Sequence, residues 1–284
     1  MARITVAALV AAYLDLSPLR PVTRKQHGYH MRPLIARWGR RSAARLTCAD
    51  LSGYAEDGIR QGLALTTLAA RVRIIKAAYR WGVASGRLAS SPIDGYRLPR
   101  ARARRISPPS RDELRAMLRV CAPHVARVIK IGWYLGPRIG PSELFRLRWA
   151  DVDLASGILR MPCAVKADGD DMRDLPIRGV LLREMRRWRR DDGDLCPWVI
   201  HWRARPVRHI NRAFDAARKK AGIARKFTPY SLRHAFPTQA IAHGAALKAV
   251  CAMMGHKSPR MVLEVYQHID FATLADAAEK TPRL

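Results

Sequence analysis

Apolar residues recur every three or four positions through the first ninety residues of the chain. This is the period of amphipathic helices, which bury one face against neighbouring elements. The spacing predicts four helices, near residues 3–16, 23–38, 48–61 and 65–84. Glycines follow three of these segments, at Gly39, Gly62 and Gly86, and glycine is common just beyond a helix end. We therefore expect a helical domain over residues 1–97.

The pattern breaks between residues 97 and 110, where the sequence reads RLPRARARRISPPS. This stretch holds five arginines and three prolines but almost nothing to bury. Such a composition is typical of an extended segment between domains, so we predict a linker over residues 98–109. Its arginines either follow a phosphate backbone or stay solvated on a hinge, and the sequence favours neither.

A second domain is predicted over residues 110–284. Ser110 and Glu113 form a capping-box pattern that begins a helix, and another helix is expected at 124–135. Between 151 and 177, short β-type runs separated by glycine and aspartate predict a small antiparallel sheet with a hairpin turn near 166–172. Helical spacing then returns near residues 179–190, 206–220, 229–243, 246–254, 259–267 and 271–279. The predicted fold class is mainly α with a small antiparallel β-sheet.

The charge of the chain narrows the choice of partner. Its 284 residues include 52 lysines and arginines against 23 aspartates and glutamates, for a net charge of +29. Up to Leu98 there are 16 basic and 5 acidic residues, and after it 36 and 18, so the two parts carry +11 and +18. Because both parts are basic, a polyanion that touches both is the simplest explanation. We expect this partner to be double-stranded DNA.

Several other classes of protein are disfavoured by the sequence. No run approaches eighteen apolar residues, and the apolar start is interrupted by Asp15 and lacks a small-residue cleavage site. We therefore expect a cytoplasmic, nucleoid-associated protein with no membrane contact. The five cysteines are scattered without a CxxC pair, as in proteins with reduced thiols. Metal-ligand spacings and a Walker-type GxxxxGK[ST] are missing, so we expect neither a metal nor another cofactor.

Candidate chemistry begins in the stretch LGPRIGPSELFRLRW. It places Arg138 at a break between helices that is rich in glycine and proline, where a guanidinium can point into a groove. The planar fork of arginine suits two phosphate oxygens at once. Glu143 lies near enough in the sequence to orient Arg138.

Two later stretches add further basic groups and a candidate nucleophile. In TPYSLRH, we interpret Thr228 as a helix N-cap and Pro229 as the first helical residue. Arg233 would then face outward from the first turn, near the positive helix N-terminus that favours phosphate. The stretch MGHKSP contains His256, and Tyr266 follows ten positions later.

In this order and spacing, the stretches LGPRIGPSELFRLRWADVD, TPYSLRHAF and MGHKSPRMVLEVYQH resemble the conserved boxes of the tyrosine recombinase or phage integrase family. The similarity covers residues 108–270, and the helical part before it resembles the core-binding domain of the family more loosely. The resemblance implies a helical, SAM-like core-binding domain and a catalytic domain with the DNA breaking-rejoining fold. It also implies a site-specific DNA recombinase or integrase that needs neither metal nor ATP.

The resemblance assigns a role to each matched residue. Arg138 and Arg233 would clamp the scissile phosphate, and His256 would donate a further hydrogen bond. Lys166, in the predicted hairpin turn, would be the general acid for the departing 5′-oxygen. Tyr266 would attack phosphorus and form a 3′-phosphotyrosyl bond. Such preorganised cations stabilise the charge that develops on a phosphodiester in its transition state.

Two departures from the family pattern bear on this site. Tyr230 stands three residues before Arg233, where the family commonly has histidine, although its hydroxyl can also donate to phosphate. The Gly140-Pro141 pair lengthens the common R-x-x-E arrangement and leaves the position of Glu143 open.

Further residues are assigned by sequence alone. Candidates for phosphate support are Tyr230, His234 and Glu143. Lys130 and Lys257 are alternatives to Lys166, and Pro237 is expected to kink its helix. Candidate DNA contacts outside the boxes are Arg71, Arg73, Lys76, Arg100, Arg102, Arg104 and Arg105.

The resemblance also implies an assembly, a homotetramer on paired DNA sites that is a monomer or weak oligomer without DNA. The segment after Tyr266 would dock either on a neighbouring subunit or on its own domain. Two other functions remain open at this point. One is a DNA-binding relative that has lost catalysis, and the other is a type IB topoisomerase-like enzyme.

Overall fold

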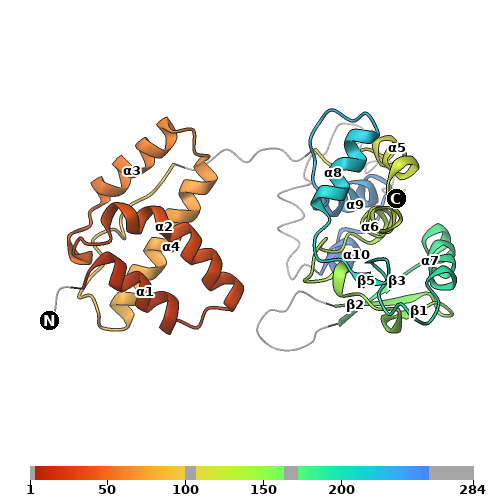
Figure 1. The fold of residues 1–284 in the computed structure, drawn as a ribbon, viewed down its shortest axis with the longest axis horizontal. Coiled ribbons are helices and arrows are strands. Elements are labelled where there is room, and N and C mark those ends of the chain that lie inside the picture. The colour runs from red at the N-terminus through yellow and green to blue at the C-terminus, as the bar shows by residue number, and fades with distance from the viewer. Residues whose placement is uncertain (1–3, 100–106, 163–171, 256–284) are drawn as a thin grey trace, which may run out of the picture. The chain divides into compact units, whose positions relative to one another are not determined.

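The structure is a computed structural model that describes residues 4–99, 107–162 and 172–255. The chain forms two compact units, Met1–Arg104 and Arg105–Leu284 (Figure 1). Each unit has its own cluster of buried apolar side chains. The boundary between them falls inside the segment predicted as a linker.

Four α-helices appear among the described residues of the N-terminal unit, together with the short 3-10 helix η1 (Ala43–Arg45). They are α1 (Val6–Leu16), α2 (Pro21–Trp38), α3 (Cys48–Arg60) and α4 (Leu65–Ala84). The four predicted helices are confirmed, and polar side chains cap the starts of α1 and α3. Thr5 accepts from the backbone N–H of Ala8, and Thr47 and Asp50 form a reciprocal capping box.

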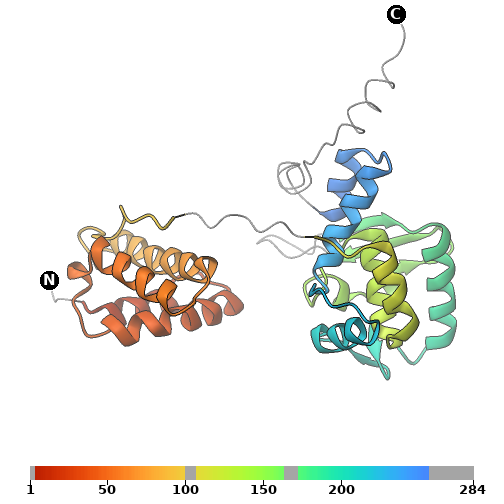
Figure 2. The ribbon, with the colours of Figure 1, turned by 90° about the horizontal axis from the view of Figure 1, so that it is seen from above.

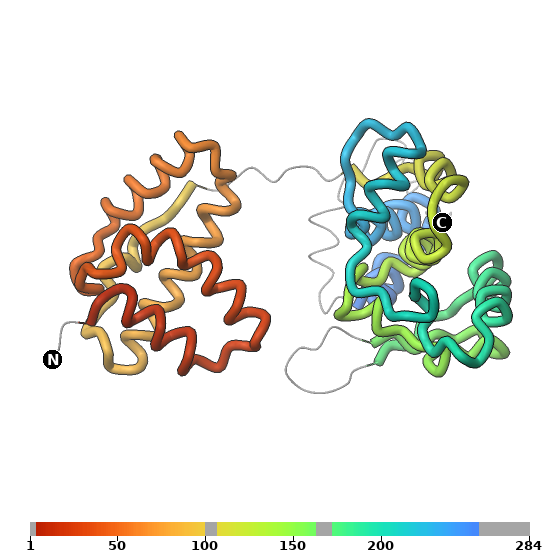
Figure 3. Tube along the Cα trace, viewed as in Figure 1, coloured from red at the N-terminus to blue at the C-terminus, as the bar shows by residue number. Residues whose placement is uncertain are grey.

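The core of this unit lies between α1, α2 and α4, which pack side by side (Figure 2). Leu9, Leu34 and Ile75, one from each helix, are fully buried. Residues 85–99 follow α4 without a regular element of their own (Figure 3). This stretch nevertheless completes the core, because its side chains Leu88, Ile93 and Tyr96 are buried in the same cluster.

The predicted glycine stops are of two kinds. Gly62 and Gly86 lie just beyond α3 and α4 with φ of 78° and 70°, the left-handed region that glycine enters without steric cost. Gly39, in contrast, ends α2 with φ of −54°. It ends the helix without leaving the right-handed region.

The C-terminal unit is built from helices around a small sheet. Its helices among the described residues are α5 (Arg111–Val120), α6 (Pro123–Leu135), η2 (Leu144–Arg146), η3 (Trp149–Asp151), α7 (Gly179–Asp192), α8 (Asn211–Lys220), α9 (Ser231–Ala242) and α10 (Leu247–Met254). The predicted capping box is confirmed at the start of α5, where Ser110 and Glu113 bond each other's backbone N–H. Pro237 lies inside α9, which continues past it to Ala242.

The three-stranded sheet has the order β1-β2-β3, and both pairings are antiparallel. Its strands are β1 (Val152–Asp153), β2 (Ile158–Pro162) and β3 (Met172–Pro176). Pro162 pairs with Met172, so these two residues flank the segment 163–171. The predicted fold class, mainly α with a small antiparallel sheet, is confirmed. The predicted hairpin turn lies outside the described residues except for Met172.

The helix predicted at 206–220 is wrong over its first five residues. Residues 201–206 instead form a hairpin of β4 (His201–Trp202) and β5 (Arg205–Pro206). Val207 and Ile210 are buried from the irregular segment that follows, and α8 begins only after them. Their apolar spacing therefore reflects burial of a loop. The helices predicted at 259–267 and 271–279 lie outside the described residues.

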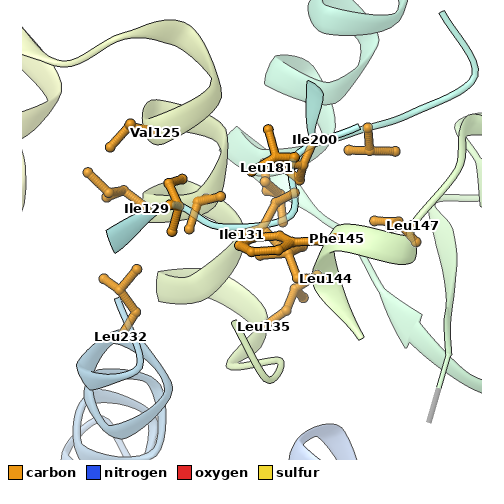
Figure 4. Packing of buried hydrophobic residues seen from close by; sticks show 14 of the residues in the cluster. Val125, Ile129, Ile131, Leu135, Leu144, Phe145, Leu147, Leu181, Ile200 and Leu232 are labelled. Carbon is orange, nitrogen blue, oxygen red and sulfur yellow. The ribbon is translucent and has the colours of Figure 1, made fainter. Parts of the chain in front are cut away.

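The core of the C-terminal unit surrounds α6. Figure 4 shows Leu144 and Phe145, from the turn after α6, close to Ile131 and Leu135 of that helix. The end of α6 also lies against α9. A Cβ atom on Gly136 would come within 2.9 Å of the Cβ atom of Phe236. The absence of a side chain at Gly136 thus lets α6 end directly beneath α9.

A buried ion pair joins α6 to α7. The guanidinium of Arg127 donates to both carboxylate oxygens of Asp192, at 2.7 and 2.6 Å, and also to the carbonyl of Val199. Trp149 Nε1 donates to the same carboxylate, and His201 Nε2 lies 2.9 Å from it. Burial alone would raise the pKa of Asp192, but these hydrogen bonds and the charge of Arg127 hold it below its ordinary value.

Gly136→Ala should destabilise the protein by about 1–3 kcal/mol, because alanine would be strained at φ of 59° and would also meet Phe236. Gly140→Ala is the matched control from the same loop, since no atom lies within 4 Å of its Cβ position and its φ is not positive. Urea unfolding of both variants measures the difference. Equal losses of stability would contradict the account of Gly136.

Asp192→Asn should cost about 3–5 kcal/mol, because it leaves the buried Arg127 without its counter-charge. The carboxylate of Asp192 has a lowered pKa, so its contribution is complete above the unfolded value of about 4 and is lost as pH falls through the folded value. The variant should therefore melt with a smaller dependence on pH below about 4. Asp191→Asn, on the exposed face of α7, should keep the parent dependence. A variant with the parent's acid dependence would refute this.

Candidate active site

The turn after α6 fixes the position of Arg138, the first candidate residue. Gly136 ends the helix in the left-handed region, and the chain then folds back through hydrogen bonds from Leu144 N to Arg138 O and from Phe145 N to Gly140 O. This return brings Glu143 to Arg138 in spite of the additional Gly140-Pro141 pair. One carboxylate oxygen accepts from Arg138 N at 2.8 Å, and the other accepts from its Nη1 at 2.5 Å. Glu143 therefore fixes both the backbone and the guanidinium of Arg138.

Glu143 is itself completely buried, whereas Arg138 keeps 31% of its side chain exposed. Burial alone would raise the pKa of Glu143. Hydrogen bonds from Arg173 and from the backbone of Arg138, together with the charges of Arg173 and Arg233, instead hold that pKa below its ordinary value. Glu143 is therefore an anion at neutral pH. The open side of Arg138 is available to an anion from solution.

Arg233 reaches the same carboxylate from α9. It is only 2% exposed, and its Nη1 lies 3.9 Å from Glu143 Oε2. Its Nη1 also donates to the carbonyl of Gly136, and its Nη2 donates to the carbonyl of Met254. Burial lowers the pKa of Arg233 to about 10, so it remains a cation at neutral pH.

The predicted direction of Arg233 is wrong. The helix starts at Ser231, after a turn in which Ser231 N donates to Thr228 O. Thr228 is therefore not the N-cap, and Pro229 is not the first helical residue. Arg233 in the first turn of α9 faces inward because that helix packs on α6.

Arg173, on β3, is the residue that the sequence analysis missed. Its Nη2 donates to Glu143 Oε2 at 2.7 Å, and its Nε donates to the carbonyl of Met253 at 3.0 Å. The signal was present in the strand pattern, because alternate residues of a strand share one face. Leu175 and Ile177 are buried, so the same period places Arg173 on the inward side.

Three arginines thus meet one carboxylate within the part of the chain that the structure describes. Arg138, Arg173 and Arg233 bring three positive charges to the single negative charge of Glu143. They come from a loop, a strand and a helix that are far apart in the sequence. The excess of positive charge, next to one partly exposed guanidinium, suits a phosphate group.

Two candidates for phosphate support, Tyr230 and His234, lie at the start of α9. Tyr230 is 49% exposed, and its ring packs edge-on against His234 with centroids 5.3 Å apart. Burial and the nearby charge of Arg233 lower the pKa of His234, so its imidazole is neutral at pH 7. Three predicted catalytic residues, Lys166, His256 and Tyr266, lie outside the described residues.

The candidate DNA contacts in the N-terminal unit differ in their surroundings. Lys76 donates to the carbonyls of Asp94 and Tyr96, and Arg71 donates to the hydroxyl of Tyr54. Both therefore hold local structure, while Arg73 is exposed. Four further candidates lie outside the described residues, namely Arg100, Arg102, Arg104 and Arg105.

One group of side chains has the composition of a metal site. Ligand atoms of Asp192, Cys196 and His201 lie within 4.8 Å of one another. The carboxylate of Asp192 is already satisfied by Arg127 and Trp149, and a cation there would face a guanidinium. Asp192 and His201 belong to the buried ion-pair network between α6 and α7, and the thiol of Cys196 donates to the carbonyl of Trp198.

The chain resembles known proteins over almost its whole length. XerC from Xanthomonas campestris pv. campestris (strain B100) is 28% identical over 246 residues, which cover 84% of this chain and 74% of that protein. XerC from Vibrio parahaemolyticus serotype O3:K6 is 25% identical over 268 residues, covering 90% and 84%. Both proteins are named tyrosine recombinases.

Solved structures share the fold at lower identity. The Tn1549 transposon integrase, in complex with a circular intermediate DNA, has a TM-score of 0.80 at 19% identity and covers 98% of this chain and 99% of its own. A λ integrase dimer bound to a COC′ core site has a TM-score of 0.78 at 16% identity and covers 99% and 80%.

No helix among the described residues is long and apolar enough to cross a membrane.

Membership of a family follows from the sequence. The phage integrase family signature matches residues 110–273, more than half of the chain. The chain therefore belongs to the phage integrase family and is a tyrosine recombinase.

Proposed function

We propose that this tyrosine recombinase cleaves and rejoins specific sites in double-stranded DNA through a 3′-phosphotyrosyl intermediate on Tyr266. The observation that carries the proposal is the cluster of Arg138, Arg173 and Arg233 around the buried Glu143. A phosphodiester gains negative charge on its nonbridging oxygens as it is attacked, and fixed cations stabilise that charge without reorganising.

Arg138 is the group that best fits a direct contact with the phosphate. Its guanidinium is partly exposed, and Glu143 binds it from the protein interior. Arg233 lies near the same carboxylate and adds positive charge from a buried position. We assign the clamp on the scissile phosphate to these two arginines, with a hydrogen bond from His256 and support from Tyr230.

The reaction transfers one strand in two steps. The phenol of Tyr266 loses its proton to solvent as its oxygen attacks phosphorus, and the bond to the 5′-oxygen breaks. Lys166 gives that oxygen a proton, which leaves a free 5′-hydroxyl. In the second step a 5′-hydroxyl from the partner duplex gives its proton to Lys166 and attacks the same phosphorus, and the bond to Tyr266 breaks as its oxygen regains a proton from solvent. The free energy of the phosphodiester is retained in the protein–DNA bond, so no ATP is needed.

The assembly follows from exchange between two duplexes. We propose that residues 1–97 form a core-binding domain and residues 110–284 a catalytic domain, joined by the linker 98–109, and that both touch DNA. Four subunits would act on two paired sites, with a monomer or weak oligomer in the absence of DNA. The high positive charge of both parts supports the proposed contacts with DNA, and from this partner we infer an association with the nucleoid.

The covalent intermediate is tested with a nicked duplex whose sequence is first selected from a random pool by binding to the protein. The parent should form a protein–DNA adduct that survives denaturation, because the nicked fragment diffuses away and traps the phosphotyrosine. Tyr266→Phe should bind the duplex equally but form no adduct. Tyr134→Phe, an exposed tyrosine on α6, is the control and should form it.

The outcomes separate this enzyme from its alternatives. No adduct from the parent would show a DNA-binding relative without catalysis and would end the proposal. Relaxation of supercoiled DNA that lacks the selected site would indicate a type IB topoisomerase-like activity.

Arg138→Met should slow adduct formation by about 10²–10³-fold at saturating DNA, because one fixed donor to the transition state is lost. Arg146→Met is the control, since this arginine is exposed on η2 in the same turn. It should cleave at the parent rate. A parent rate in Arg138→Met would contradict the assignment of the phosphate clamp.

A further inference from the structure

We propose that Arg173 is a positioning residue of the active site, an inference that rests on the proposed function. One guanidinium joins Glu143 to the C-terminal end of α10, and through Glu143 it sets Arg138. The geometry is direct. Arg173 Nη2 donates to Glu143 Oε2 at 2.7 Å, and Arg173 Nε donates to Met253 O at 3.0 Å.

The position of Arg173 in the chain makes this link useful. It follows Met172, the first residue of β3, so its strand leads directly out of the segment that carries Lys166. The end of α10 that it holds leads in turn into His256, directly after Gly255. Arg173 therefore links the end of the segment that carries Lys166 to the start of the segment that carries His256. The contacts that make this link involve only Glu143, Arg173 and Met253.

The end of α10 is shaped to receive a guanidinium. The last carbonyls of a helix have no partner within it and carry partial negative charge. Arg173 donates a hydrogen bond to the carbonyl of Met253, and Arg233 donates one to the carbonyl of Met254. A Cβ atom on Gly255 would lie 2.9 Å from Arg173 Nη1, so the glycine leaves room for the side chain.

Arg173 also decides how much positive charge Arg138 presents. The carboxylate of Glu143 has two short guanidinium partners, Arg138 and Arg173. Arg173 is only 11% exposed and does not face solution as Arg138 does. By compensating the buried anion, Arg173 leaves the charge of Arg138 available to the phosphate, while Glu143 still fixes the geometry of Arg138.

Lysine cannot replace arginine in this role. The two hydrogen bonds leave Arg173 from different nitrogens of one planar group, toward a carboxylate on one side and a carbonyl on another. An ammonium group is a single point that cannot span both partners in this way. Arg173→Lys should therefore lose positioning although it keeps the charge.

The test compares single-turnover cleavage of the nicked duplex at saturating DNA with DNA affinity, using the full chain. Arg173→Met and Arg173→Lys should keep the DNA affinity of the parent but cleave about 10–100-fold more slowly, because the phosphate cradle is misplaced. Arg160→Met is the matched control, an arginine on the neighbouring strand with 69% of its side chain exposed. It should cleave at the parent rate.

A second variant separates positioning from stability. Arg173→Met leaves a buried carboxylate short of one partner, and this loss can lower the melting temperature by itself. Arg173→Lys keeps a positive charge beside Glu143 and should therefore melt closer to the parent. It should nevertheless stay slow, since an ammonium group cannot hold both Glu143 and the carbonyl of Met253.

Each outcome decides the inference. A slow Arg173→Lys with a melting temperature near that of the parent supports positioning. A parent rate in Arg173→Met or in Arg173→Lys would overturn it, as would cleavage rates that follow the melting temperature across the variants. An inactive parent would overturn the proposed function and this inference together, whereas an active parent matched by Arg173→Met would overturn this inference alone.

Discussion

The buried carboxylate of Glu143 is the constraint on which the site depends. An ion that is completely removed from water must be compensated by nearby charges and hydrogen bonds. Glu143 meets this requirement with Arg138 and Arg173 at hydrogen-bond distance and Arg233 slightly farther away. Because these arginines come from a loop, a strand and a helix, one anion fixes the relative positions of three elements. The contacts that compensate the buried charge of Glu143 are therefore the same contacts that assemble the cationic site.

The positive charge of the cluster suits a phosphate group. Three guanidinium groups lie around one carboxylate among the described residues, so positive charge predominates there. Arg138 brings part of this charge to the surface, where a phosphodiester can complete the balance. The net charge of +29 over the whole chain adds a long-range attraction for DNA that weakens with salt. Local geometry and overall charge thus favour the same class of substrate.

Much of the fold follows from the sequence because its signals are local. The four N-terminal helices carry amphipathic spacing, and α3 also carries the capping residues Thr47 and Asp50, which act within a single turn. The sheet was also predictable from its β-type runs. The β4–β5 hairpin was not, because strands of two residues have no detectable period. Val207 and Ile210 are buried side chains of a loop, and their spacing of three residues resembles that of a helix.

Arg138 and Arg233 were both predicted from the sequence, and the structure brings them to the same carboxylate. Their geometry was less predictable, because the inward direction of Arg233 depends on where α9 begins and on its packing against α6. Arg173 was missed because its role depends on contacts across long sequence distances, to Glu143 and Met253.

The most direct measurement is an experimental structure of Tyr266→Phe bound to its selected duplex. The account predicts that the scissile phosphate lies within hydrogen-bonding distance of Arg138, while Glu143 still joins Arg138 to Arg173. A phosphate held elsewhere, with Arg138 turned away or Glu143 separated from both arginines, would contradict it.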